Sequence, residues 1–336
     1  MGLRPASRAR IVLILLYHRV ARLPSDPWSL AVTPQRFAEH LEVLRRQARP
    51  MRLSQLAGAL VDESLPDRAV IVTFDDGYAD NLHNAKPLLE RYDVPATIFL
   101  PSGFINYDYE FWWDELDRLL LSGKLPKRNL RLRANGTTYR WRLGETADYS
   151  GQELRCHRGW NASEEAPTTR HALYKSIWEL LHPMSESERR TILDKLRRWA
   201  GAQSAPRPSR HRLLSLEEMS VLANEELIEI GAHTVTHVML STLSEESQRD
   251  EILGSKVHLE EILGRPVSSF AYPFGRRSDY DSRTVDVVRQ SGFRCACCNF
   301  SGIVKPSSDP FQLPRVQVQD WGGDEFSARL SWWFDR

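Results

Sequence analysis

The sequence lacks the long apolar segments that mark a membrane protein. No run approaches the roughly 18 apolar residues that a membrane-spanning helix needs. The run at residues 11–16 follows Arg4, Arg8 and Arg10 and so has the outline of a signal peptide, but it is too short and no small-residue cleavage site follows closely. We therefore interpret residues 11–16 as a buried strand. We predict a soluble, cytoplasmic protein with no transmembrane segment.

An excess of charge of either sign is also lacking. The 336 residues include 45 Lys and Arg against 44 Asp and Glu, a net charge of +1. This balance creates no overall attraction to nucleic acid or to an anionic membrane, so we predict no nucleic-acid partner. The length allows one large domain with an insertion or two ordinary domains, and composition leaves the oligomeric state open.

Cysteine is scarce, which excludes the disulfide framework of a small secreted protein. Three of the four cysteines, Cys295, Cys297 and Cys298, lie in one strand-like segment at residues 293–298. Side chains alternate along a strand, so Cys298 should face away from the other two, and a shared metal site would need a distorted backbone. We interpret these cysteines as buried, unreactive thiols.

Most of the chain alternates between short strand patterns and helical patterns. The strand patterns are apolar on both faces, which is typical of a parallel sheet or barrel covered by helices, and so predicts an α/β fold. Helix starts are expected at Thr33-Pro34 and at Ser215, where Glu218 completes a possible capping box. A later helix should stop near Gly264. The clearest strand candidates are residues 11–16, 69–74, 96–100, 228–233 and 269–274.

The alternation is lost between residues 104 and 210, which we interpret as a mainly helical insertion. This segment holds six of the ten tryptophans. It shows helical patterns at residues 111–121 and 172–199, with strand-like alternation near 130–143. Its tryptophans could stack on sugar rings or form a second small core, and the sequence favours neither. The predicted division is 1–103, 104–210 and 211–336.

Two adjacent carboxylates, Asp75 and Asp76, directly follow an apolar strand and precede Gly77. Open α/β sheets and barrels place their functional sites at such strand ends. Neighbouring strand positions face different ways, so one carboxylate can bind a cation while the other remains free to act as a base. The alternative is an Asp-Asp-Gly turn with no chemical role.

A second strand ends in two histidines, His233 and His237, four residues apart. Over one turn this spacing brings two imidazoles to the same side. Two imidazoles and one carboxylate make a three-ligand set with open positions, which predicts a catalytic divalent metal, with Zn²⁺ favoured. Hydrogen-bonded surface histidines are the alternative. A third strand breaks at Pro273 and Gly275, a turn that can direct backbone N–H groups inward or simply end the strand.

In this order the three motifs resemble those of the polysaccharide deacetylases, the NodB-homology family of carbohydrate esterases. Residues 73–77 (TFDDG) resemble the first motif, and the resemblance implies that Asp75 is the catalytic base and Asp76 a metal ligand. Residues 233–237 (HTVTH) resemble the second, which completes the metal site. Residues 272–275 (YPFG) resemble the third, which implies an oxyanion contact from the Phe274 N–H. Residues 17–20 resemble the first-strand signature of one branch, and the implied fold is a distorted (β/α)7 barrel.

The sequence departs from the family pattern at two places. The third motif usually carries an arginine that tethers the catalytic aspartate, whereas Ala271 stands there, so Arg315 is expected to substitute. The last motif usually supplies a histidine as general acid, but no histidine follows His258. The remaining candidates for the acid are His18, which we favour, Asp320, and Asp75 itself acting as base and then acid.

We therefore predict a metal-dependent hydrolase that removes an N-acyl group, in the first instance acetyl, from an amino sugar. The expected substrates are an amino sugar, a nucleotide sugar or a lipid-linked glycan, and not an assembled wall polymer. The alternatives are a deformylase or imidase on a related substrate, and an inactive sugar-binding relative. Further residues expected to contact substrate are Tyr78, Tyr272, Pro273, Gly275 and Trp321.

Overall fold

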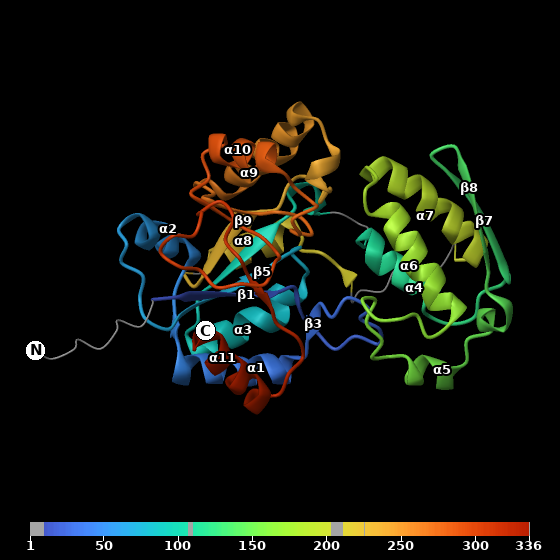
Figure 1. The fold of residues 1–336 in the computed structure, drawn as a ribbon, viewed down its shortest axis with the longest axis horizontal. Coiled ribbons are helices and arrows are strands. Elements are labelled where there is room, and N and C mark those ends of the chain that lie inside the picture. The colour runs from blue at the N-terminus through green and yellow to red at the C-terminus, as the bar shows by residue number, and fades with distance from the viewer. Residues whose placement is uncertain (1–9, 107–109, 203–210, 225, 336) are drawn as a thin grey trace, which may run out of the picture. The chain divides into compact units, whose positions relative to one another are not determined.

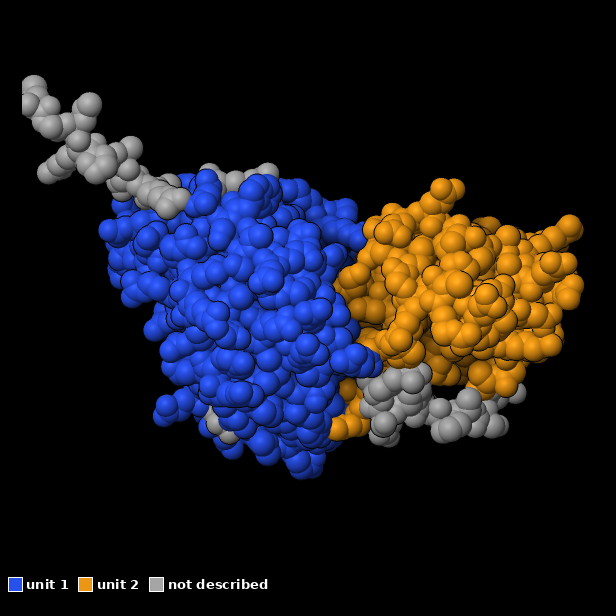
Figure 2. Space-filling model, turned by 90° about the horizontal axis from the view of Figure 1, so that it is seen from below, with its two compact units in different colours: residues 1–22, 31–106, 213–336 blue, residues 23–30, 107–212 orange. Residues whose placement is uncertain are grey.

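The computed structural model describes residues 10–106, 110–202, 211–224 and 226–335, which form two compact units (Figures 1 and 2). Unit 1 contains residues 1–22, 31–106 and 213–336, and unit 2 contains residues 23–30 and 107–212. Unit 2 therefore contains all of the predicted insertion at 104–210 except residues 104–106, and also residues 23–30, which we predicted as part of the barrel. None of the described helices is long and apolar enough to cross a membrane.

Unit 1 is built on a parallel sheet whose seven main strands form one continuous path. An isolated parallel bridge between Cys297 and Leu313 links the last residue of β11 to the segment that leads into β12. The expected distorted barrel of about seven strands is confirmed. In spatial order the strands are β11 (Cys295–Cys297), β10 (Ser269–Ala271), β9 (Ile228–Ala232), β6 (Ala96–Leu100), β5 (Ala69–Phe74), β1 (Val12–Tyr17) and β12 (Val316–Gln317); β4 (Arg49–Pro50) pairs with β5, and β2 (Arg19–Val20) pairs with β3 (Ala31–Val32) apart from this sheet.

Alternation along the strands creates two separate hydrophobic cores. Val12, Ile14 and Ile71 belong to an inner core with Phe99. The alternate residues of the same strands, such as Leu13 and Val72, belong to a larger core shared with the helices. Both faces of β1 and β5 are therefore buried, which explains why these segments are apolar throughout.

The helices of unit 1 surround this sheet, with α1, α3 and α11 grouped beside β1 and β5 and with α9 against α10 (Figure 1). The predicted capping box at Ser215 is present, and Gly264 ends α9 in a left-handed conformation. Thr33 precedes α1 as expected but does not cap it, because its hydroxyl donates to Asp320 at 2.8 Å. The helices are α1 (Pro34–Gln47), α2 (Leu53–Val61), α3 (Lys86–Tyr92), α8 (Leu216–Ala223), α9 (Glu245–Leu263), α10 (Ser282–Gln290) and α11 (Gly323–Phe334), with short turns η1 (Asn81–Ala85), η2 (Ser102–Phe104) and η5 (Leu240–Thr242).

Unit 2 is mainly helical, with one antiparallel hairpin where strand-like alternation was expected. The helical pattern at 172–199 is two helices, because Pro183 interrupts the first and Ser185 caps the second. The elements are α4 (Trp112–Leu120), β7 (Asn129–Ala134), β8 (Thr137–Arg142), η3 (Gly144–Ala147), α5 (Gly151–Cys156), α6 (Thr169–Leu181) and α7 (Glu186–Ala200).

The tryptophans of unit 2 are mostly buried. Five of the seven tryptophans in unit 2 are no more than 9% exposed, namely Trp112, Trp113, Trp160, Trp178 and Trp199. Trp112 lies edge-on to Trp113 and 5.7 Å from Trp178 between ring centroids. The structure therefore favours the second-core interpretation for these five side chains over direct stacking on a sugar.

The cysteine segment has the predicted arrangement. Cys295 and Cys297 belong to the inner core, and Cys298 to the outer one. Burial raises the pKa of Cys295 to about 12 and that of Cys298 to about 11, which keeps both thiols protonated and unreactive at neutral pH. Cys156, in unit 2, is exposed.

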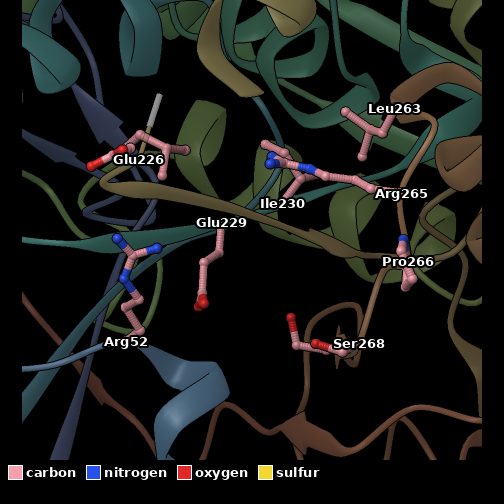
Figure 3. A pocket seen from close by; sticks show the side chains of 10 residues that line it. Arg52, Glu226, Glu229, Ile230, Leu263, Arg265, Pro266 and Ser268 are labelled. Carbon is pink, nitrogen blue, oxygen red and sulfur yellow. The ribbon is translucent and has the colours of Figure 1, made fainter. Parts of the chain in front are cut away.

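A pocket of about 310 Å³ lies at the amino ends of β9 and β10, away from the strand ends that carry the predicted site (Figure 3). Glu229 lies at its centre between Arg52 and Ser268. The Glu229 carboxylate already accepts hydrogen bonds from the Ser54 N–H, the Ser54 hydroxyl and the Thr97 hydroxyl. These contacts tie α2 to the sheet, so Glu229 has a structural role.

Candidate active site

The carboxyl ends of β5 and β9 bring the predicted metal ligands together inside unit 1. One Asp76 oxygen lies 3.2 Å from His237 Nε2 and 3.6 Å from His233 Nε2. One ligand atom from each of the three side chains lies within 4.8 Å of the other two, and all three residues are buried. Two imidazole nitrogens and a carboxylate oxygen form a donor set that suits a divalent transition metal.

Left-handed backbone conformations occur at each of the three loops around this cluster. Asp76 has φ of 78°, His237 of 50° and Phe274 of 58°. Side chains other than glycine rarely adopt this region, at a cost on the order of 1–3 kcal/mol each. Such strain is retained where it orients functional groups, and here it turns the ends of β5, β9 and β10 toward one centre.

The ring of His233 is held in the orientation that a metal ligand requires. Its Nδ1–H donates to the carbonyl oxygen of Ala271 at 2.7 Å, which leaves the Nε2 lone pair facing Asp76. For Asp76, burial alone would raise the pKa, but the interactions with His233 and His237 together outweigh burial, and the pKa lies well below the ordinary value. The carboxylate is therefore ionised and available as a ligand.

Arg315 tethers Asp75 inside the barrel. The guanidinium donates to both carboxylate oxygens, at 2.7 and 2.6 Å, while Nε donates to the carbonyl of Cys298 at 2.8 Å. Burial raises the pKa of Asp75, but the charges of Arg315 and His233 and the hydrogen bonds from Arg315 together outweigh burial, so the net pKa is lowered. Arg315 thus makes the contact predicted for it in place of the absent arginine at Ala271.

His18 lies next to the cluster, at the end of β1. The side chain of Asn81 donates to its carbonyl oxygen at 2.9 Å, and its Nδ1 is buried with no hydrogen-bond partner among the described residues. Burial lowers the pKa of His18, partly opposed by the charges of Asp76 and Asp75. The imidazole is therefore mainly neutral at pH 7 in the resting site.

The turn after β10 lies against the second histidine. The ring of Phe274 is edge-on to that of His237, with centroids 4.8 Å apart. Gly275 has φ of 67°, and a Cβ there would lie 2.7 Å from the backbone nitrogen of Asn299, so only glycine fits. Pro273 is buried beside it. The turn therefore brings the predicted oxyanion donor, the Phe274 backbone, beside the metal-ligand cluster.

Three residues predicted to contact substrate make packing contacts instead. Tyr272 is 1% exposed, stacks on Tyr280, and donates its hydroxyl to the carbonyl of Phe311 at 2.9 Å. Tyr78 is fully buried beneath Arg19, whose guanidinium lies 4.1 Å from its ring centroid. Trp321 packs against the outer core, and its carbonyl oxygen lies 2.8 Å from His40 Nε2.

Asp320, an alternative general acid, is exposed and accepts hydrogen bonds from the Thr33 N–H and hydroxyl, both at 2.8 Å. These contacts anchor the start of α1. They give Asp320 a structural role and leave His18 as the candidate nearest the cluster.

Two acidic residues that support the site were not identified from the sequence. Asp80 accepts from the Val20 N–H at 2.9 Å and pairs with Arg19 at 3.0 Å, which fixes the loop after His18. Glu251, on α9, accepts three hydrogen bonds from the loop between the two histidines. Neither Asp80 nor Glu251 belongs to a recognisable motif. The sequence indicated only that each is a carboxylate on an element next to a motif.

The family model for polysaccharide deacetylases matches residues 62–126 and 199–296, which include both carboxylates and both histidines. Over these two segments the chain is similar to the polysaccharide deacetylase family. A curated relative, YxkH of Bacillus subtilis, is 28% identical over 139 residues, a match that covers 40% of this chain and 48% of the relative. The alignment thus spans about half the length of that relative.

Solved structures show the same fold. IcaB from Ammonifex degensii has a TM-score of 0.59 at 18% identity, and the match covers 97% of each chain. The deacetylase PplD of Streptococcus pyogenes, solved with acetate, has a TM-score of 0.58 at 17% identity over 96% of this chain and 99% of its own. A de-N-acetylase from Aggregatibacter actinomycetemcomitans has a TM-score of 0.56 at 13% identity, over 95% and 99% of the two chains. This deacetylase fold places the cluster at the carboxyl ends of the strands.

Proposed function

We propose that this protein is a metal-dependent N-deacetylase that acts on an N-acetylated amino sugar in a glycan. The observation that carries the proposal is the position of Asp75, held by Arg315 and adjacent to the cluster of Asp76, His233 and His237. A fixed, ionised base beside a three-ligand donor set is what metal-assisted amide hydrolysis requires.

The donor set fits a divalent cation, and Zn²⁺ is our proposal for it. Asp76, His233 and His237 would hold the ion. Asp76 is ionised, and the hydrogen bond to Ala271 orients the His233 ring so that Nε2 faces the cluster, as a metal ligand requires. When bound, the cation would polarise the amide carbonyl and lower the pKa of a water from about 15.7 toward 7.

The protein's own groups perform the remaining steps. Asp75 accepts the proton of the attacking water, and Arg315 keeps its carboxylate oriented and ionised at neutral pH. The backbone N–H of Phe274 donates to the oxygen that becomes negative as the carbonyl is attacked. Collapse of the tetrahedral intermediate breaks the C–N bond, and the amine leaves after it gains a proton.

We propose His18 as the group that returns this proton, with Asp75 acting as base and then acid as the alternative. Support for His18 comes from its buried position beside Asp75 and Asp76 and from its unpartnered Nδ1. Because its pKa is lowered by burial, His18 would have to gain the proton during turnover before it can give it up.

A polymeric, nucleotide-linked or lipid-linked amino sugar fits this chemistry equally well. A deformylase or imidase would use the same residues, whereas an inactive sugar-binding relative would need neither Asp75 nor its tether. The buried Asp75–Arg315 pair favours an enzyme, because an unused pair of charges would be costly to bury. Action inside the cell stays a prediction.

The test combines Asp75→Asn with a matched control. We expect a 10²- to 10⁴-fold lower kcat for acetate release from N-acetylated glucosamine oligomers, with unchanged metal content by elemental analysis. Asp67→Asn, at an exposed position just before β5, should retain wild-type activity. Comparing acetate with formate release separates the deformylase alternative. Near wild-type activity of Asp75→Asn would refute the assignment of the base.

A further inference from the structure

We propose that Glu251 is a positioning residue of the metal site, which holds the loop between His233 and His237 in its ligating conformation. This inference rests on the proposed metal-dependent function, but it concerns a residue outside the ligand set. Glu251 lies within α9, fourteen residues after the second histidine, and belongs to none of the motifs.

The contacts of Glu251 are concentrated on two consecutive loop residues. One carboxylate oxygen accepts the N–H groups of Val235 and Thr236, at 2.9 and 2.8 Å. The other accepts the Thr236 hydroxyl at 2.6 Å. Successive backbone N–H groups that converge on one anion form a concave binding site, and hydrogen bonds to a charged acceptor are stronger than neutral ones. A single helical side chain thereby anchors the centre of the loop.

The opposite side of the loop is held by η2. The N–H groups of Ser102 and Gly103 donate to the carbonyl oxygens of Thr234 and Val235, at 3.0 and 2.9 Å. A Cβ on Gly103 would lie 2.8 Å from the Val235 oxygen, so this approach requires glycine. The loop is therefore held from both sides. Its carbonyl oxygens accept hydrogen bonds from η2, and its N–H groups donate hydrogen bonds to Glu251.

This clamp matters because the loop is strained. Thr234 and His237 have φ of 65° and 50°, and the His237 N–H donates to the Thr234 hydroxyl oxygen at 3.0 Å. Without Glu251, Val235 and Thr236 would lose three hydrogen bonds, and the loop could relax toward ordinary φ values. His237 would then move relative to Asp76, while the strand residue His233, bonded to Ala271, would stay in place.

The experiment measures Co²⁺ binding by purified full-length protein, using visible absorption and competition with a chelator. Glu251→Gln preserves shape but removes the charge and replaces one acceptor oxygen with a donor. We expect a 10- to 100-fold weaker Co²⁺ affinity and a changed absorption band, with unchanged far-UV circular dichroism of the metal-free protein. Saturating metal should restore most of kcat, with KM unaffected.

Two further variants sharpen the test. Glu251→Asp keeps the charge and both acceptor oxygens, so it should recover part of the lost affinity. Glu261→Gln, at an exposed position on the same helix, removes the same charge and should bind Co²⁺ like the wild type. An unchanged Co²⁺ affinity and spectrum in Glu251→Gln would overturn the proposal, as would loss of folded structure in its metal-free form.

The outcomes separate this inference from the proposed function. Wild-type protein that binds one Co²⁺ but releases no acetate would refute the deacetylase proposal and leave the Glu251 comparison valid. Wild-type protein that binds no Co²⁺ would refute the metal site, and the role of Glu251 with it. An active wild type, together with weaker Co²⁺ binding in Glu251→Gln but not in Glu261→Gln, would support both the deacetylase proposal and the role of Glu251.

Discussion

Arg315 and Asp75 form a buried, bidentate ion pair inside the barrel, with 2.6 Å between Arg315 Nη2 and Asp75 Oδ2. The two residues lie 240 positions apart in the sequence. Arg315, which directly precedes β12, reaches the base, whereas position 271, where the motif resemblance leads us to expect the arginine, is an alanine of the inner core. The tether therefore comes from the chain just before β12 and not from β10.

Removal of this tether should impair both catalysis and stability. Arg315→Met leaves the Asp75 charge buried without its partner, so we expect the free energy of unfolding to fall by about 3–5 kcal/mol. A misplaced base should lower kcat about 10²-fold, with metal content unchanged. Urea unfolding and acetate release measure the two effects. Arg329→Met, which breaks an exposed pair with Glu325, is the control. If both variants behaved alike, the tether would be unimportant.

The pair also predicts how stability depends on pH in the metal-free protein. The pKa of Asp75 is lower in the folded state than its ordinary value of 3.8. Its ionised form therefore stabilises the fold fully above pH 3.8, and this stabilisation is lost as the pH falls through the lowered folded pKa. Urea unfolding from pH 7 to pH 3 should show a steep loss below about pH 4. The double variant Asp75→Asn/Arg315→Met should show a shallower loss, and equal slopes would contradict the assignment.

Metal removal should destabilise the protein as well as inactivate it. A ligand present at 100 times its Kd stabilises the folded state by about 2.7 kcal/mol, so dialysis against a chelator should remove about that much. Asp76→Asn should show little difference between metal-containing and metal-free buffer. Thermal unfolding with and without Zn²⁺ provides the comparison. Equal stability and persistent activity of the chelated wild type would rule out metal dependence.

The role of His18 as proton donor predicts a dependence on the leaving group. His18→Gln should lower kcat for an N-acetyl amino sugar by about 10²-fold or more, because the amine must be protonated to leave. Hydrolysis of p-nitrophenyl acetate, whose leaving group needs no proton, should be affected much less. Equal losses on both substrates would indicate that His18 only packs the site. His83→Gln, at an exposed position in unit 1, serves as the control.

The burial of the tryptophans in unit 2 predicts a stability effect. Trp112 is 1% exposed, and Trp112→Ala should cost about 3–5 kcal/mol and make unit 2 sensitive to limited proteolysis. Trp332→Ala, at a residue 52% exposed, should change stability by no more than about 0.5 kcal/mol. A Trp112→Ala protein of wild-type stability but raised KM would instead favour substrate contact.

Local features were predicted well where neighbouring residues determine them. The strands at 69–74 and 96–100 have the predicted bounds, and Ser215 caps α8 as expected. Asp75, Asp76 and the two histidines come together because parallel strands end at the same edge of a barrel. That rule needs only the strand assignments, which follow from residue type and spacing.

Contacts between distant segments were harder to predict. Tyr272 and Trp321 were expected at the substrate site, but aromatic type and proximity to a motif do not reveal which way a side chain points. Tyr272 is buried, and the partly buried Trp321 packs against the outer core. Residues 23–30 pack with unit 2 through contacts such as that of Trp28 with Tyr174, 146 positions away. No periodic pattern marks such a pairing.

The sequence by itself determined where the main strands lie along the chain, the three motifs and the identity of the candidate ligands, because periodicity and turn chemistry act over a few residues. Only the tertiary structure decided how the site is supported. Asp75 is held by an arginine that directly precedes the last strand, and the histidine loop is held by Glu251 from a helix. Long side chains such as these can reach several neighbours, and the choice among them depends on the three-dimensional packing of the barrel.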